Sequence, residues 1–176
     1  MHYRRSDAAG ATYFFTVNLA QRKDDLLVRY IDDLRNSINA VKRAHRFAIT
    51  AMVVLPEHLH TVWQLPLDDA DYPMRWSLIK AGFSRCIEKT EYIRVSRRIK
   101  RERGIWQRRY WEHQIRDDID LERHVDYIHY NPVKHSLVSR AVEWPYSTLH
   151  DYIAKGLAPV DWGGGGHDTG GIYGER

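Results

Sequence analysis

Residues 47–65 read FAITAMVVLPEHLHTVWQL and predict two strands that follow one another along the chain. The stretch 47–55 is apolar apart from one threonine, which is typical of a strand buried in a core. Pro56 ends this strand, because proline lacks the N–H that a ladder of strand hydrogen bonds requires. The stretch 58–65, which Pro66 follows, predicts the second strand. The short connection indicates that the two strands pair as an antiparallel hairpin.

Outward from this hairpin, the chain alternates between strand patterns and helix patterns. Aromatic and β-branched residues in TYFFTVNL predict a strand, and apolar residues three and four apart predict an amphipathic helix after it. The predicted elements are strands at 12–19 and 110–116, and helices at 24–44, at 73–92 and from 118 towards 132. The order strand, helix, strand, strand, helix, strand, helix predicts an α+β fold with helices packed on one antiparallel sheet. A ferredoxin-like (RRM-like) core is the natural candidate for that order.

Length and composition indicate one folded domain. The chain has 176 residues, of which 43% are hydrophobic, and a domain usually takes roughly 150. Cys86 is the single cysteine, which excludes an internal disulfide and a cysteine-rich zinc cluster, and we expect it to be a small buried side chain. The N-terminus has no signal-peptide pattern, and the longest near-apolar run, 47–55, is too short to span a bilayer. These features predict a cytoplasmic protein that does not enter a membrane.

Glycine is concentrated near the C-terminal end. Seven of the eleven glycines fall between Gly163 and Gly174. Such a composition is typical of a flexible segment. We therefore expect a domain at 1–162 and a flexible glycine-rich tail at 163–176.

The net charge of +4 is distributed unevenly along the chain. The stretch 94–109, RVSRRIKRERGIWQRR, has eight basic residues and one acidic residue, so it carries +7 and the remainder carries −3. This concentration is typical of a polyanion-binding protein, because each Lys or Arg placed on a phosphate releases counterions. Trp106, Tyr110 and Trp111 add rings of the kind that stack on unpaired bases. The alternatives are a solvated basic segment and aromatic side chains that belong to the core.

His58 and His60 lie two residues apart in the second strand of the hairpin. Side chains alternate between the faces of a strand, so both imidazoles project from one face and can chelate a single ion. The alternative role for such a pair is to hydrogen-bond other polar groups. Amidohydrolase barrels share the H-x-H pattern, but that fold takes about 250 residues or more, so this chain is too short for it. We expect Glu57 to point to the opposite face from both histidines.

Four polar residues follow one stripe of the last predicted helix. They are Asp120, His124, Tyr127 and Asn131, spaced four, three and four apart. The neighbouring apolar stripe should pack on the sheet, so Tyr127 is either an amphipathic packing residue or a functional group beside the sheet. Pro132 disfavours helical geometry in the residue before it, so Asn131 can alternatively cap a new turn.

Three motifs together resemble a known enzyme family. They are VVLPEHLHTVWQLP, WEHQIRDDIDLERHVDYIHYNPVKHSLV and the later WPYS. From Tyr13 to about Trp162, the chain resembles the HUH single-tyrosine transposases of insertion-sequence type. It more closely resembles the REP-associated tyrosine transposases, which accompany repetitive extragenic palindromes (REPs) in bacterial genomes. The family fold is a ferredoxin-like sheet with the histidine strand at its centre and the tyrosine on a helix.

The resemblance implies roles for individual residues. His58 and His60 match the two histidines that hold a divalent ion, Mg²⁺ or Mn²⁺, and Asn131 matches the third ligand, where many relatives have glutamine. Tyr127 matches the nucleophile that attacks single-stranded DNA and forms a 5′-phosphotyrosine. A phenol has an ordinary pKa of about 10, so its deprotonation requires assistance. The candidates to assist, besides the metal, are His124, Lys134 and His135.

The resemblance also implies a DNA partner, a single-stranded hairpin of REP type with a short guide sequence at the foot of its stem. The residues expected to contact it are Arg94, Arg97, Arg98, Lys100, Arg101, Arg103, Trp106, Arg108 and Arg109, with Arg4 and Arg5 in support. Trp106 or Trp111 is expected to stack on an unpaired base. The tail is expected to reach into the DNA site or to cover it.

The same resemblance gives an expectation for the oligomeric state. Insertion-sequence relatives are dimers that supply the tyrosine in trans, whereas the REP-associated branch acts as monomers with the tyrosine in cis. We therefore expect a monomer, with a dimer as the alternative.

Two other functions are consistent with these residues. One is a hairpin-binding protein or repressor that has kept the fold and lost catalysis, although the intact His58, His60 and Tyr127 argue against it. The other is a metal-dependent hydrolase that uses the histidines without the tyrosine. Formation of a covalent DNA adduct separates both from a transposase.

Overall fold

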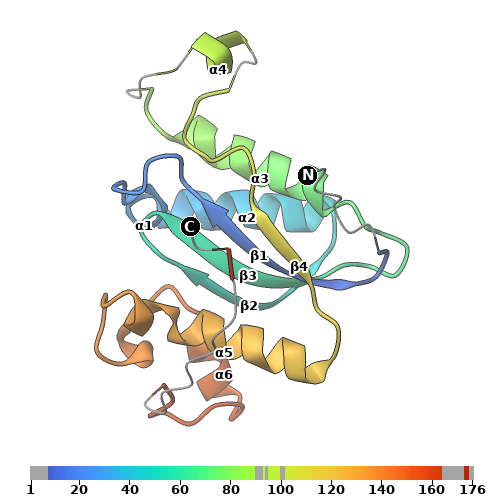
Figure 1. Cartoon of the computed structure of the whole chain (residues 1–176), viewed down its shortest axis with the longest axis vertical. Helices are drawn as coiled ribbons and strands as arrows, with labels where there is room; N and C mark the ends of the chain where they lie inside the picture. The colour runs from blue at the N-terminus through green and yellow to red at the C-terminus, as the bar shows by residue number, and fades with distance from the viewer. Residues whose placement is uncertain (1–7, 90–92, 94, 100–101, 164–172, 175–176) are drawn as a thin grey trace.

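The computed structural model describes residues 8–89, 93, 95–99, 102–163 and 173–174 (Figure 1). They form three layers, in which a four-stranded sheet lies between two helices on one face and a third helix on the other. The strands are β1 (Thr12–Asn18), β2 (Ala48–Val54), β3 (His58–Gln64) and β4 (Trp111–Gln114). The helices are α1 (Leu26–Arg29), α2 (Ile31–Ala44), α3 (Tyr72–Cys86), α4 (Val95–Ile99), α5 (Asp118–Lys134) and α6 (Leu149–Ala154), with a 3₁₀ turn at Ala141–Glu143.

The strands are antiparallel to their neighbours and follow the order β2-β3-β1-β4. This is the strand order of a ferredoxin-like sheet, so the predicted fold class is confirmed. The histidine strand β3 lies in the interior of the sheet, between β2 and β1, and β4 lies at its edge. In this register Thr16 of β1 is opposite His60, which brings a hydroxyl to the histidine pair.

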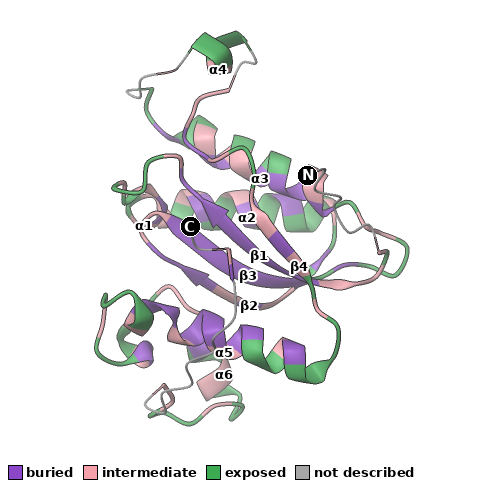
Figure 2. Ribbon diagram, viewed as in Figure 1, coloured by how far each residue is buried: buried purple, intermediate pink, exposed green. Residues whose placement is uncertain are grey.

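The alternation of side chains along the strands divides the core between the two faces of the sheet. Phe15 and Trp63 project to the face that α2 and α3 cover, where they pack with Trp76. Phe14 projects to the other face and packs with Ile128 of α5. The two central strands, β1 and β3, are buried on both faces as a result, whereas β2 and β4 are only partly buried (Figure 2).

Two predicted helices have different limits. The predicted helix at 24–44 is interrupted at Tyr30, which leaves helical geometry between α1 and α2. The predicted helix at 73–92 ends at Cys86, after which Ile87 is extended. Cys86 is exposed, and the expectation that it is buried is wrong, because Ile87 occupies the next core position beyond α3.

α5 continues through Pro132, which lies near its C-terminal end. The carboxylate of Asp117 caps the helix by accepting a hydrogen bond of 2.8 Å from the backbone N–H of Asp120. Asn131 is fully buried inside the helix, so the alternative that it caps a new turn is wrong. A proline in the last turn removes few helical hydrogen bonds, which is why the helix tolerates it. Within the described residues, none of the helices combines the length and the hydropathy that crossing a bilayer requires.

Candidate active site

His58 and His60 project from β3 onto the face of the sheet that α5 covers. Their ring centroids lie 4.9 Å apart, and both side chains are buried. The alternation of the strand therefore brings the two imidazoles together on one face, as the sequence predicts.

One hydrogen bond holds each imidazole through Nδ1. Nδ1 of His60 lies 2.8 Å from Oγ1 of Thr16, and this hydroxyl donates its proton to the backbone carbonyl of Tyr173 at 2.6 Å. A hydroxyl has one proton, so Nδ1 of His60 is the donor in the first bond and the ring's lone pair is on Nε2. Nδ1 of His58 donates to Oε1 of Glu57 at 3.0 Å, which assigns the same tautomer. Metal-binding histidines are held in this way by the nitrogen that does not face the ion, so the pair fits a divalent metal on its Nε2 atoms.

Glu57 does not point away from the histidines, and that expectation is wrong. It lies before the start of β3, in the turn where the backbone N–H of Leu55 donates to the carbonyl of His58 at 2.8 Å. Strand alternation does not apply in a turn, so the carboxylate is able to reach the His58 ring. Burial acts to raise the pKa of Glu57, but the hydrogen bond from His58, together with the other favourable contacts of the carboxylate, outweighs burial and lowers the pKa. An ionised Glu57 thus orients His58.

Tyr127 projects from α5 toward the histidine pair. Its ring centroid lies 5.2 Å from that of His60, and the side chain is 4% exposed. The ammonium of Lys134, two helical turns later, donates a hydrogen bond of 3.0 Å to the Tyr127 hydroxyl and lies 4.7 Å from its ring centroid. A cation at this oxygen favours the phenolate over the phenol.

The other predicted site residues of α5 have different surroundings. Asn131 is fully buried one turn after Tyr127. His135 is exposed after the end of the helix, and its ring centroid lies 5.1 Å from that of His58. Of the predicted stripe, Tyr127 therefore contacts the histidine pair; of the residues predicted to assist it, His135 lies beside His58 and Lys134 bonds to Tyr127.

His124 belongs to a separate cluster with His113 and Asp120, whose potential ligand atoms all lie within 4.8 Å of one another. His113 projects from β4 to the α5 face, whereas Glu112 projects to the other face. Oδ2 of Asp120 accepts hydrogen bonds from Nε2 of His113 at 2.8 Å and from the backbone N–H of Arg116 at 3.0 Å. Burial acts to raise the pKa of Asp120, but these bonds outweigh it and lower the pKa, while burial lowers the pKa of His124. The members of the cluster thus bond to one another and brace β4 against α5.

Tyr173 lies directly on the candidate nucleophile. Its ring stacks on that of Tyr127 with centroids 3.6 Å apart and planes at 14°. At the next residue, Gly174, φ is +74°, and a Cβ would lie 2.4 Å from the side chain of Trp111, so only glycine fits. The position of Tyr173 could not be predicted from the sequence, because glycine content shows that a tail is present and does not show where it lies. Residues 164–172 and 175–176 of the predicted tail lie outside the described residues.

The predicted DNA-contacting arginines do not form a uniform surface. Those that the structure describes are Arg97 and Arg98 on α4, and Arg103, Arg108 and Arg109 between α4 and β4. Arg94, Lys100 and Arg101 lie outside the described residues, as do Arg4 and Arg5. Arg98 and Arg109 are exposed, whereas Arg103 donates to the backbone carbonyls of Ile87 at 2.5 Å and Glu88 at 2.8 Å. Arg103 therefore ties the basic segment to the end of α3.

Trp106 is part of the core. It is 7% exposed, its ring packs against Phe83 with centroids 5.4 Å apart, and its Nε1 donates to the carbonyl of Lys80 at 3.2 Å. Little of its ring surface is left for a base, which argues against the stacking role predicted for it. Trp111, the other predicted stacking residue, is half-buried at the start of β4.

Similarities of sequence and of structure to known proteins identify the family of this chain. No protein-family model matches it. A REP-associated tyrosine transposase of Escherichia coli (strain K12) is 45% identical over 162 residues, which cover 92% of this chain and 90% of the relative. A Haemophilus influenzae relative with the same family name is 42% identical over 164 residues, 93% of either chain. Among solved structures, a REP-associated tyrosine transposase bound to a REP hairpin has a TM-score of 0.85 and 44% identity, covering 100% of this chain and 98% of its own. The fold, the identity and the coverage together show that this chain belongs to the family of REP-associated tyrosine transposases.

Proposed function

We propose that this chain is a transposase-like enzyme that binds a REP-type DNA hairpin, cleaves single-stranded DNA and rejoins strands through a phosphotyrosine. The observation that carries the proposal is the position of Tyr127, whose ring lies 5.2 Å from that of His60 and whose hydroxyl accepts from Lys134. Membership of the family supports it, and the hairpin in the relative's structure supports this class of DNA.

The proposed cofactor is a divalent ion, Mg²⁺ or Mn²⁺, with His58, His60 and Asn131 as its ligands. Support comes from the tautomer of the histidine pair, in which Glu57 and Thr16 accept the Nδ1 protons and the lone pairs are on Nε2. When bound, such an ion withdraws charge from a phosphate and orients it for attack.

In the proposed reaction the hydroxyl oxygen of Tyr127 attacks a backbone phosphorus in line with the 3′ oxygen. A tyrosine–phosphorus bond forms, the bond from phosphorus to the 3′ oxygen breaks, and that oxygen takes up a proton and leaves as a 3′-hydroxyl. Lys134 holds the attacking oxygen as the phenolate. One phosphate ester replaces another, so attack by a different 3′-hydroxyl reverses the step and rejoins strands without ATP.

We propose a monomer with the tyrosine acting in cis. The support is that Tyr127 and His60 of one chain are already in contact distance, with no second copy required. Mixing His58→Ala protein with Tyr127→Phe protein tests this, since activity should not return if each active site lies within one chain. Recovery of adduct formation in the mixture would contradict the proposal.

We also propose that the tail covers the nucleophile when no DNA is bound. Tyr173 stacks on Tyr127, and its backbone carbonyl accepts from Thr16, which also holds His60. DNA would have to displace this ring before the Tyr127 oxygen reached a phosphate.

The decisive experiment looks for the covalent intermediate. A labelled REP-type hairpin with unpaired flanks is incubated with Mn²⁺ and the protein, and the adduct is resolved on a denaturing gel. Wild type should form it and Tyr127→Phe should not, whereas Tyr130→Phe, a matched change on the same helix, should retain it. Adduct formation by Tyr127→Phe would show that the nucleophile is misassigned. A wild-type protein that binds the hairpin without forming an adduct would instead be a hairpin-binding protein or repressor.

A further inference from the structure

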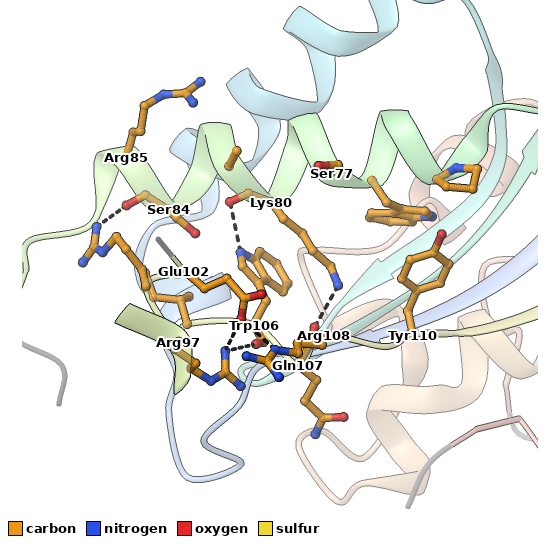
Figure 3. A pocket seen from close by; sticks show the side chains of 16 residues that line it. Ser77, Lys80, Ser84, Arg85, Arg97, Glu102, Trp106, Gln107, Arg108 and Tyr110 are labelled. Carbon is orange, nitrogen blue, oxygen red and sulfur yellow. Dashed lines mark hydrogen bonds and ion pairs between the residues drawn. The ribbon is translucent and has the colours of Figure 1, made fainter. Parts of the chain in front are cut away.

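A groove of about 690 Å³ lies between α3 and the segment that leads into β4 (Figure 3). Ser77 and Lys80 of α3 line one side, and Arg97 and Arg108 line the other. The aromatic part of the lining is Trp76, Trp106 and Tyr110. These rings belong to the core on the α2 and α3 side of the sheet, whereas Tyr127 belongs to the core on the α5 side. The groove is therefore on the face of the sheet opposite the candidate active site.

The lining of the groove carries an excess of positive charge. Its charged side chains are Lys80, Arg85, Arg97, Arg103 and Arg108, with the single carboxylate Glu102. Glu102 accepts from Arg108 at 2.8 Å and offsets only part of that charge. Nζ of Lys80 donates to the carbonyl of Gln107 at 3.0 Å and lies 5.1 Å from the ring centroid of Tyr110. The groove thus presents a cation fixed above an aromatic ring, in a positive surrounding that attracts a polyanion.

The size and chemistry of the groove favour an unpaired strand over a duplex. A volume of about 690 Å³ lies in the range of roughly 300–1,000 Å³ that small-ligand pockets span, which suits one or two nucleotides. A double helix is too wide to enter a space of this size. Cations beside aromatic rings are the combination with which proteins bind single strands, since phosphates contact the cations and bases contact the rings.

The edge strand β4 joins the groove to the candidate active site. Tyr110 packs with the core on the groove side, whereas Trp111, the first residue of β4, packs with the core on the active-site side. Arg109 is exposed immediately before this point. A DNA strand in the groove would therefore have to pass over the edge of β4 to reach the Tyr127 face.

We propose that the groove binds the unpaired segment beside the hairpin, with phosphates on Lys80, Arg97 and Arg108 and a base against Tyr110. The DNA then crosses the edge of β4 to reach Tyr127. This inference rests on the proposed DNA-cleaving function. It extends the binding surface to α3, because Ser77 and Lys80 lie outside the basic stretch of the sequence.

The test measures DNA binding by Tyr127→Phe protein, in which cleavage is not needed. Ser77→Glu adds a carboxylate at an exposed position of the groove, and Lys80→Gln removes its central cation. Asn39→Glu, at an exposed position of α2 outside the groove, makes the same charge change as Ser77→Glu and is the matched control. Fluorescence anisotropy compares a REP-type hairpin that has unpaired flanks with the same hairpin cut to blunt ends. Thermal unfolding confirms that each variant is folded.

The groove variants should bind the flanked hairpin about tenfold more weakly, with a salt dependence shallower by roughly 0.7 for each single-strand phosphate that the variant no longer neutralises. Their affinity for the blunt hairpin should stay within about twofold of the parent, and the control should change neither value. Unchanged affinity for the flanked hairpin would overturn the inference. Equal weakening for both hairpins would overturn it too, because the stem would then occupy the groove. Neither result affects adduct formation by the wild-type protein, which tests the proposed function separately.

Discussion

Replacement of Lys134 by methionine should slow adduct formation by roughly 10- to 100-fold at neutral pH. The Lys134 ammonium donates to the Tyr127 hydroxyl at 3.0 Å, so it contacts the oxygen that becomes negative in the proposed reaction. A hydrogen bond to a charged group contributes about 1.5–3 kcal/mol, and about 1.4 kcal/mol of barrier is a factor of ten in rate. The lysine is exposed, and solvent screening therefore favours the lower half of this range. Methionine keeps the length of the side chain and removes only its charge and its donors.

The pH dependence separates this electrostatic role from a structural one. Loss of about 1.5–3 kcal/mol of phenolate stabilisation should move the rise in rate to higher pH by about 1–2 units, so the variant should approach wild type in alkaline solution. Single-turnover adduct formation with Mn²⁺, followed by denaturing gel electrophoresis across a pH series, measures the shift. Lys134→Arg retains the charge and a donor and should stay within a few-fold of wild type. An unchanged pH profile, or an equal loss of rate at every pH, would contradict an electrostatic role for Lys134.

Three further predictions concern the tail, the core and acid stability. Truncation after Trp162 should speed adduct formation about two- to tenfold, because it removes the stacking of Tyr173 on Tyr127. A stacked aromatic pair contributes about 0.5–1.5 kcal/mol. Equal rates for the two proteins in a time course would argue that the tail does not cover the site. Arg75→Met should lower the free energy of unfolding by about 3 kcal/mol, because the buried guanidinium donates to Asp69 at 2.6 and 2.8 Å; urea titration would show no change if the pair contributes nothing. Burial, with repulsion from a second histidine, lowers the pKa of His129 to about 4, whereas an unfolded histidine titrates near 6.5. The unfolded chain therefore binds the proton first as the pH falls, and stability should decrease by up to about 3 kcal/mol between pH 6.5 and 4. His129→Gln should flatten this decline in denaturant titrations, and an unchanged slope would assign the acid sensitivity to other groups.

Elements with strong local patterns could be predicted from the sequence, and elements defined by breaks or by packing could not. The strands at 47–55 and 58–65 and the helix from 118 have clear alternation or helical spacing, and the structure has them within a few residues. The interruption at Tyr30 has no proline or glycine to indicate it. The exposure of Cys86 could not be predicted either. This residue lies at the end of α3, where the neighbouring Ile87 takes the core position, and that choice depends on packing and not on composition.

In the candidate site too, some residues are placed by local periodicity and others only by tertiary packing. Strand alternation by itself determined that His58 and His60 share a face, and helical spacing determined that Tyr127 and Asn131 share a stripe, because both periodicities are properties of the local backbone. Only the tertiary structure brings Lys134 to the Tyr127 hydroxyl, stacks Tyr173 on Tyr127 and makes Lys80 line a groove with residues of the basic stretch. These contacts join side chains from a helix end, a distant tail and the opposite face of the sheet. They arise from the way the layers pack, and no local period in the sequence encodes that packing.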